Sequence, residues 1–204
     1  MNTYDRSIAV MDKYSVLRIT EFSMIEKLYH KRLKKDFAAD ELRPLGSIKH
    51  SWDLNAYECY GLFDGHEAVG YAFFVHNGRH CLLDYFAISE ELRGKGLGSY
   101  FLHQLNDKIK ETDCILVEVE NPDAVKDRDA RRKRESRLQF YLRNGFQKTE
   151  LTSILFGVNY RILEKPLEIS RTTEELSLVY TEMYRSILPA LFFHTKLRIH
   201  VDGE

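Results

Sequence analysis

The decisive stretch of this chain is LLDYFAISEELRGKGLGS, residues 82–99. It opens with an apolar strand pattern and ends with three glycines. An amphipathic helix follows, whose apolar side chains recur every four residues at Leu97, Phe101, Leu105 and Ile109. Glycines at a strand–helix junction let the main chain approach a ligand closely, and the first amides of a helix have no helical partners. With the helix dipole, these amides predict an anion site, for which a phosphate-bearing ligand is the natural occupant.

The glycine segment, residues 93–99, fits some kinds of phosphate site and not others. A P-loop is excluded because Lys95 lies between glycines, with no Ser or Thr directly after it. A dinucleotide-binding turn requires G-x-G-x-x-G directly after the first strand of a parallel unit. This segment reads G-x-G-x-G, starts some residues beyond Ile88 and follows an antiparallel meander, which disfavours that interpretation. The third interpretation, a glycine-rich helix start that binds no ligand, stays open.

The flanking segments predict a mixed α/β sheet. Strand patterns at 56–63, 68–75 and 80–88 are separated by Asp64-Gly65 and Asn77-Gly78, which suit tight hairpin turns. The helix after the glycines is a crossover long enough to make the strand at 114–120 parallel to 80–88. The remaining expected elements are a strand from Val16 to Ile19, helices at 20–34, at 36–55 and before Asn144-Gly145, and strands at 146–150 and 153–163.

Composition excludes several classes of protein. The 204 residues carry 30 Lys and Arg against 31 Asp and Glu, and 44% are hydrophobic, which predicts a soluble domain without a nucleic-acid backbone as its main ligand. No apolar run approaches the ~20 residues of a membrane span, and MNTYDRSIAV lacks a signal pattern. The cysteines are few, odd in number and without metal-ligand spacing: Cys59, Cys81 and Cys114. We expect a cytoplasmic protein with no metal, nucleic-acid or membrane partner.

Residues 166–204 are expected to form a C-terminal arm beside a main domain at 1–165. Thr172 and Glu175 have the spacing of a capping box, and an apolar stripe follows at Leu176, Val179, Met183 and Ile187. Residues 191–201 are apolar enough for a strand. The stripe must be buried on its own domain or on a second subunit, so a homodimer through this arm is a hypothesis.

These patterns resemble the GCN5-related N-acetyltransferase (GNAT) family, whose acetyl-coenzyme A loop reads Gln/Arg-x-x-Gly-x-Gly/Ala. Arg93, Gly96 and Gly98 match that loop, and the later segment FYLRNGF, residues 140–146, matches in order and position. The resemblance extends over about 14–163. It implies a GNAT-like α/β fold: a mixed, mostly antiparallel central sheet flanked by helices, here with a C-terminal helix and strand arm.

The resemblance implies acetyl-CoA as co-substrate and assigns the residues that bind it. The backbone of Phe86, Ala87 and Ile88 would pair with its acetyl and pantetheine parts, in the V-shaped opening that the family has between the strands at 80–88 and 114–120. The loop amides would hold the pyrophosphate: Arg93, Gly94, Lys95, Gly96, Leu97, Gly98 and Ser99. Asn121 follows its strand as the family's cleft asparagine does. It stands 20 positions before Tyr141, a longer interval than the family has.

The resemblance also implies direct transfer, in a ternary complex, to a primary amine of a small molecule or a peptide. Tyr141 aligns with the tyrosine that faces the coenzyme sulfur and acts as general acid. Its alternative interpretation is an amphipathic core tyrosine, because Leu138, Tyr141 and Leu142 form an apolar helical patch. The function, too, has alternatives: a non-catalytic acyl-CoA binding or sensing module, or a protein acetyltransferase.

Two carboxylates are candidate bases. Strand alternation places Asp84 on one face with Leu82, Phe86 and Ile88, and Glu118 belongs to the strand that borders the substrate cleft in the family. The alternatives are a buried structural acid for Asp84 and an exposed acidic pair for Glu118 with Glu120.

Two further sets of residues are candidates for contact with the ligand or the acceptor. The charged stretch 123–137 is either a solvated helix face with ion pairs or a basic lid over the ligand. Trp52, Tyr57 and Tyr60 are either core residues or the lining of an acceptor pocket.

Overall fold

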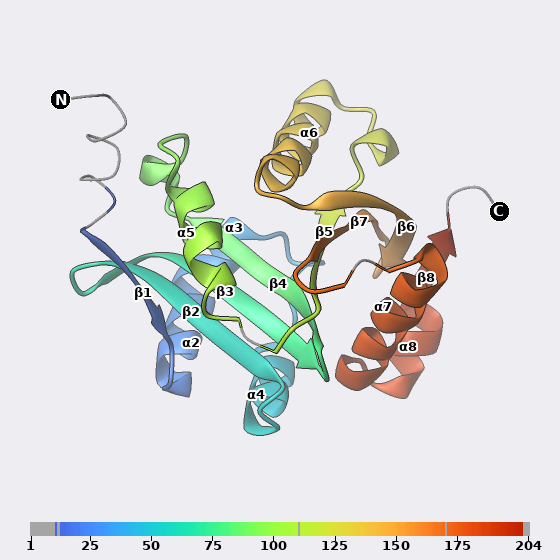
Figure 1. The fold of residues 1–204 in the computed structure, drawn as a ribbon, viewed down its shortest axis with the longest axis horizontal. Helices are drawn as coiled ribbons and strands as arrows, with labels where there is room; N and C mark the ends of the chain where they lie inside the picture. The colour runs from blue at the N-terminus through green and yellow to red at the C-terminus, as the bar shows by residue number, and fades with distance from the viewer. Residues whose placement is uncertain (1–10, 12, 110, 170, 202–204) are drawn as a thin grey trace.

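The computed structural model describes residues 11, 13–109, 111–169 and 171–201; the segment MNTYDRSIAV, expected not to be a signal sequence, lies outside them. The described residues form one eight-stranded sheet (Figure 1). Its strands are β1 (Tyr14–Arg18), β2 (Tyr57–Asp64), β3 (Glu67–Asn77), β4 (His80–Ile88), β5 (Cys114–Glu120), β6 (Gln147–Leu155), β7 (Val158–Pro166) and β8 (Leu197–Val201). Their order is β1-β2-β3-β4-β5-β7-β6-β8, and only β4 and β5 pair in parallel. The mixed, mostly antiparallel sheet is confirmed.

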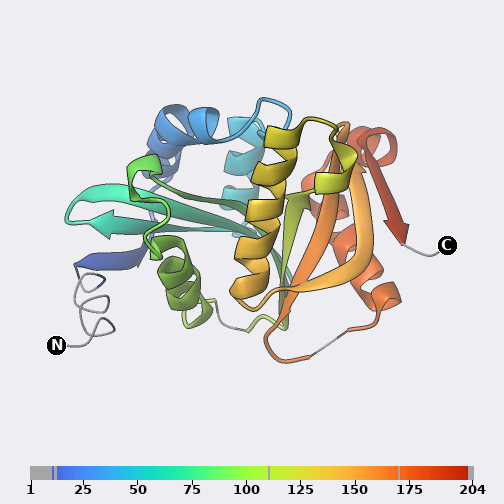
Figure 2. The same cartoon turned by 90° about the horizontal axis from the view of Figure 1, so that it is seen from above.

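Helices cover both faces of this sheet (Figure 2). One face carries α5 (Leu97–Asn106) and α6 (Arg128–Arg143), whose buried side chains form one of the two cores. The other carries α2 (Phe22–Leu28), a π-helical turn (Tyr29–Leu33), α3 (Lys34–Asp36), α4 (Leu45–Asp53), α7 (Thr173–Ile187) and α8 (Ala190–Lys196). Short 3₁₀ turns lie at Glu90–Leu92 and Pro122–Ala124. No helix in the described ranges is long and apolar enough to cross a membrane.

The hairpin turns were predicted well in two cases and wrongly in a third. Gly65 and Gly78 both have a φ of 59°, as the turns after β2 and β3 require. The predicted break between strands at 151–152 is wrong: β6 continues to Leu155, and the chain turns at Phe156-Gly157. The pairing of β6 with β7 shifts register between Lys148 and Thr152, and this irregularity interrupts the apolar alternation that the prediction followed.

A bulge in β4 changes which side chains share a face. Phe74 pairs with Leu83 and Phe73 pairs with Tyr85, so Asp84 is an extra residue without a partner position on β3. Asp84 and Tyr85 therefore lie on the α7 face of the sheet. Phe86 packs on the other face. The prediction that Asp84 shares a face with Phe86 and Ile88 is wrong, because one extra residue reverses the alternation.

The sheet opens between its two parallel strands. β4 and β5 pair from His80 opposite Cys114 to Leu83 opposite Val117, and their remaining described residues do not pair with one another. Both strands nevertheless continue, to Ile88 and Glu120. They diverge, as the resemblance implies, and leave an opening in the middle of the sheet.

The C-terminal arm packs on its own chain. Thr172 and Glu175 form the predicted capping box, and the buried stripe of α7 faces the core against β3, β4 and β6. The predicted strand at 191–201 is wrong in its first half, where Pro189 begins α8. Its second half, β8, pairs with β6 at the sheet edge opposite β1 (Figures 1 and 2). The stripe therefore needs no second subunit to cover it.

Replacing Met183 with Ala tests this packing. Met183 lies on the buried side of α7 and is fully buried. The change should lower the free energy of unfolding by about 3 kcal/mol, because it leaves a cavity in the core. Leu178→Ala is the matched control, because Leu178 on the same helix is 66% exposed and should cost less than about 0.5 kcal/mol. Urea unfolding measures both, and equal effects would show that α7 is not docked as described.

Candidate active site

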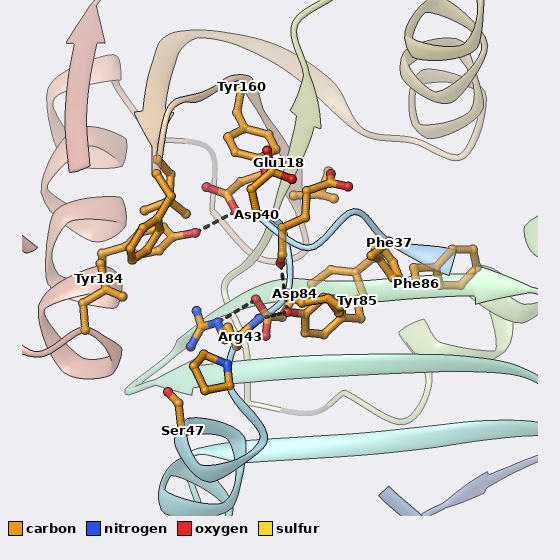
Figure 3. A pocket seen from close by; sticks show the side chains of 18 of the residues that line it. Phe37, Asp40, Arg43, Ser47, Asp84, Tyr85, Phe86, Glu118, Tyr160 and Tyr184 are labelled. Carbon is orange, nitrogen blue, oxygen red and sulfur yellow. Dashed lines mark hydrogen bonds and ion pairs between the residues drawn. The ribbon is translucent and has the colours of Figure 1, made fainter. Parts of the chain in front are cut away.

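A cavity of about 540 Å³ lies where β4 and β5 diverge. Its lining includes Phe86 and Tyr141, which belong to the α5 and α6 face, and Tyr160 and Tyr184, which belong to the α7 face (Figure 3). The cavity therefore joins the two faces through the opened sheet. Such a passage allows one ligand to enter from each side and to meet the other between the strands.

Glu118 of β5 is held in this cavity by α7. The Tyr184 hydroxyl donates a hydrogen bond of 2.7 Å to Oε2 of Glu118 (Figure 3). The Tyr180 hydroxyl donates to Oε1 of the same carboxylate. Ser153 of β6 lies 2.8 Å from the Tyr180 hydroxyl and completes the chain of polar groups. Burial raises the pKa of Glu118 to about 6, although both phenol hydrogen bonds oppose the rise. The carboxyl group thus titrates just below neutral pH, where a general base is effective.

Asp84 is paired with a residue from the segment before α4. Nε of Arg43 lies 3.1 Å from Oδ1 of Asp84, and the Tyr57 hydroxyl donates to Oδ2. Arg43 is anchored in turn, because its backbone N–H donates to the Tyr85 hydroxyl at 2.7 Å and that hydroxyl donates to the carbonyl of Glu41. The ion pair therefore ties the segment before α4 to the bulge of β4, at the edge of the cavity (Figure 3).

Tyr141 reaches the cavity from α6. Its ring meets Phe140 and Phe146 edge-on, with 5.2 Å between centroids in each contact. Burial raises the pKa of its hydroxyl to about 12, and nearby Arg137 opposes the rise. Tyr141 is therefore a neutral phenol at physiological pH and can act as a donor. All three predicted catalytic residues, Tyr141, Glu118 and Asp84, line one cavity.

The glycine loop has the geometry of an anion site. Gly96, with φ of 80°, is the left-handed residue from which α5 begins, so the first amides of the helix have no partner inside it. A Cβ on Gly98 would come within 3.2 Å of Phe140, which shows how tightly the loop packs against α6. The loop therefore fits the pyrophosphate of a coenzyme by its backbone.

The two cationic side chains of the loop are turned back on the protein. Nε of Arg93 donates to the carbonyl of Ile88 at 2.9 Å, and the same guanidinium lies 3.4 Å from Asp36. Nζ of Lys95 donates to the carbonyl of Glu91 at 2.8 Å. Both side chains hold the shape of the loop, which leaves its backbone amides for the ligand.

The half of β4 that does not pair with β5 lies beside this loop. Phe86, Ala87 and Ile88 pair with β3 on one side, and on the other β5 has diverged. The Phe86 ring stacks on Phe101 and Phe140, at 5.5 and 5.8 Å between centroids. A free strand edge accepts an extended amide-containing chain by backbone pairing, and pantetheine has that form.

Asn121 does not line the cavity. Its Oδ1 accepts from the backbone N–H of Asp123 at 3.0 Å and from Nε of Arg161 at 3.2 Å. The side chain therefore caps the 3₁₀ turn that follows β5. Contact of Asn121 with the coenzyme stays a prediction.

The charged stretch 123–137 is mostly a solvated helix face with ion pairs, and its role as a basic lid over the ligand stays a prediction. Arg131 and Arg132 make exposed ion pairs with Asp123 and Asp129, as a solvated helix face does. Arg137 instead lines the cavity, 3.5 Å from Glu120. Only the end of the stretch is part of the site.

Sequence reasoning missed the residues that the segment before α4, the β6–β7 turn and the C-terminal arm contribute: Asp40, Arg43, Phe156, Tyr184 and Phe192. None of the three aromatic candidates lines the cavity. Trp52 packs on Phe22, Tyr60 lies in the α5 core, and Tyr57 donates a hydrogen bond to Asp84 from outside the lining. One signal was available, the pair of tyrosines four residues apart within the apolar stripe of α7. In the part of the chain that the structure describes, no cluster of His, Cys, Asp or Glu could hold a metal ion.

Comparison with known proteins agrees with this geometry. Residues 55–148 match the family model of the acetyltransferase (GNAT) domain. Among curated protein sequences no match was found. The match spans β2 to the start of β6, and so includes the loop, Glu118 and Tyr141 but not the C-terminal arm. The resemblance to the GNAT family is confirmed over residues 55–148, which match the acetyltransferase domain of that family.

Solved structures show the same fold. A GNAT-family protein from Bacteroides thetaiotaomicron aligns with a TM-score of 0.68 and 17% identity, over 88% of this chain and 98% of the other. A GNAT-family acetyltransferase from Elizabethkingia anophelis with acetyl-CoA bound has a TM-score of 0.57 and 17% identity, over 76% and 99%. The ribosomal-protein-S18-alanine N-acetyltransferase of Escherichia coli has a TM-score of 0.57 and 14% identity, over 78% and 96%. At these identities the likeness establishes the fold.

Replacing Glu118 with Gln should stabilise the protein at neutral and higher pH. The folded state raises the pKa of this carboxyl from about 4.5 to about 6, so it loses stability as pH rises through that interval. The loss amounts to about 2 kcal/mol at pH 8 and vanishes below pH 4.5. Urea unfolding should therefore show Glu118→Gln gaining up to about 2 kcal/mol at pH 8 and much less at pH 5. Glu26→Gln, at an exposed site on α2, is the control. An equal gain at both pH values would contradict the assignment.

Proposed function

We propose that this chain is an acetyl-CoA-dependent N-acetyltransferase, which transfers an acetyl group to a primary amine of a small molecule or peptide by direct transfer in a ternary complex. The cavity through the opened sheet carries the proposal, because it joins a coenzyme side to a side that holds a carboxyl group titrating near pH 6. The acetyl-CoA bound to the Elizabethkingia protein and the amine acceptor of the Escherichia coli enzyme support it.

Glu118 is proposed to take the proton from the acceptor. An ammonium group has no lone pair for attack, so it must lose a proton before the amine nitrogen can bond to the thioester carbon. With a pKa of about 6, Glu118 is mostly ionised at pH 7 to 8 and can receive that proton, directly or through water. The Asp84–Arg43 pair sets the opposite edge of the cavity and adds no net charge.

Tyr141 and the β4 bulge are proposed to serve the other two steps. Attack creates an oxyanion, and the bulge leaves main-chain groups at Asp84 without ladder partners on β3, so an N–H there can donate to it. Collapse of the intermediate breaks the C–S bond and releases a thiolate. Tyr141 is protonated at neutral pH, so it passes its proton to the departing sulfur and regains one from the attacking nitrogen as the amide forms. The products are an amide, the free thiol and one proton.

The specific test is thiol release from acetyl-CoA over a panel of polyamines, aminoglycosides, amino acids and N-terminal peptides, with calorimetry of coenzyme binding. Glu118→Gln should lower kcat by about 100-fold because it removes the base. Asp84→Asn should lower kcat by a smaller factor, because it leaves Arg43 without its carboxylate partner at the edge of the cavity. The dissociation constant for acetyl-CoA should stay within about twofold in both, with Glu26→Gln as control. Unchanged turnover in both variants would remove these carboxylates from the mechanism.

The pH profile provides a separate prediction. kcat/KM should fall on the acid side with an apparent pKa near 6, as Glu118 becomes protonated. In Tyr184→Phe the carboxylate loses a hydrogen bond that favours its charge, so this limb should move about one pH unit upward. Tyr60→Phe, which is outside the cavity, should leave it in place. If the acid side of the kcat/KM profile has the same apparent pKa in Tyr184→Phe as in the parent protein, a group other than Glu118 titrates.

A non-catalytic acyl-CoA binding module is the second candidate. The observation that favours it is that both carboxylates already have partners within the chain. Coenzyme binding without turnover of any amine would support this function instead. The cytoplasmic location, the lack of nucleic-acid and membrane partners, and the division at 165 stay predictions.

A further inference from the structure

The acceptor side of the cavity is the part that lies on the α7 face of the sheet. Its lining comes from segments that do not belong to the glycine loop, α5 or α6. Phe37 comes from the segment after α3, Phe156 from the turn between β6 and β7, and Leu188 and Phe192 from the ends of α7 and α8. The rings of Phe156 and Phe192 meet at 5.8 Å between centroids, and each residue is 41% exposed. Exposed aromatic rings that line a cavity mark a surface for an apolar ligand.

The backbone at Phe156 gives an independent indication. Its φ is 48°, in the left-handed region that glycine or asparagine adopts readily and a bulky residue rarely does. Its backbone N–H donates to the carbonyl of Lys196 at 3.0 Å, which fixes the turn against α8. An aromatic residue in such a position costs folding stability that a glycine would not. The turn itself does not require a ring at this position; the ring contacts Phe192 and lines the cavity.

The charges of the acceptor side are acidic on balance. Glu118 and Asp40 line it, and Glu41 lies 4.0 Å from Arg137, which Glu120 also engages. The remaining cation, Arg43, is paired with Asp84. The pKa of Tyr160 is raised, first by burial and then by the negative charges of Glu118 and Glu41. The contribution of these carboxylates indicates a negative local potential. A cation is therefore favoured beside Glu118, whereas the wall that Phe156 and Phe192 form offers no carboxylate to a second charge.

We propose that the acceptor is a primary amine with a single positive charge on an apolar, preferably aromatic, body: the ammonium group lies at Glu118 and the body lies against Phe156 and Phe192. This inference rests on the proposed function. It makes the β6–β7 turn and the C-terminal arm the parts of the chain that select the acceptor.

Matched amines test the proposal. Thiol release from acetyl-CoA is measured with 2-phenylethylamine, ethylamine, hexylamine and 1,6-diaminohexane, and calorimetry measures binding of each amine to the protein with coenzyme A. We expect kcat/KM to be at least about tenfold higher for 2-phenylethylamine than for ethylamine, and for hexylamine than for the diamine. Preference for the diamine or for ethylamine would overturn the inference. If no amine turns over, the proposed function fails, and the order of amine binding still decides the inference.

Variants locate the selecting surface. Phe156→Gly suits the positive φ, so the fold should be at least as stable, while the loss of the ring should raise KM for 2-phenylethylamine about tenfold. KM for ethylamine and the binding of acetyl-CoA should not change. Phe192→Ala should act in the same direction, and Leu178→Ala, on the exposed side of α7, should change none of these values. Equal KM for 2-phenylethylamine in Phe156→Gly and the parent protein would place the acceptor elsewhere.

Discussion

The structure depends on one constraint: two parallel strands pair for half of their length and then separate. Four residue pairs join β4 to β5, ending at Leu83 opposite Val117. Beyond them each strand has a free edge, which must be satisfied by something other than the sheet. The opening gives an extended ligand a strand to pair with, and it turns the centre of the sheet into a passage. The bulge at Asp84 lies where the pairing ends, so bend and opening begin together.

The C-terminal arm closes what the strands leave open. β8 pairs with β6, and α7 covers the face of the sheet onto which Glu118 points. Without α7 this carboxyl would lose both of its phenol partners and part of the burial that raises its pKa. The arm buries it, and two phenols hold it in place. The part of the chain beyond the family match therefore sets the acidity of a group within the match.

Much of this could be predicted from the sequence, because the signals are local. Hairpin glycines, the capping box at Thr172 and the glycine loop each act over a few residues, and the structure has them where expected. The bulge at Asp84 could not be predicted, since alternation assumes an uninterrupted ladder and nothing in the strand marks the extra residue. The partners of Glu118 were also missed: Tyr180 and Tyr184 lie more than sixty positions away, and only tertiary packing brings them to β5. The coenzyme side was thus accessible to pattern reasoning, and the acceptor side was not.

The two sides of the cavity follow different physical rules. The coenzyme side is made of backbone: free amides at the start of α5 and a free edge on β4, which suit one invariant ligand and require few particular side chains. The acceptor side is made of side chains from the segment before α4, the β6–β7 turn and the arm. Those segments can change without disturbing the strands that are proposed to hold the coenzyme. A buried carboxyl that destabilises the fold above pH 6 and a phenylalanine at positive φ both lie on that side. Costs to stability gather where a binding surface has to be specific.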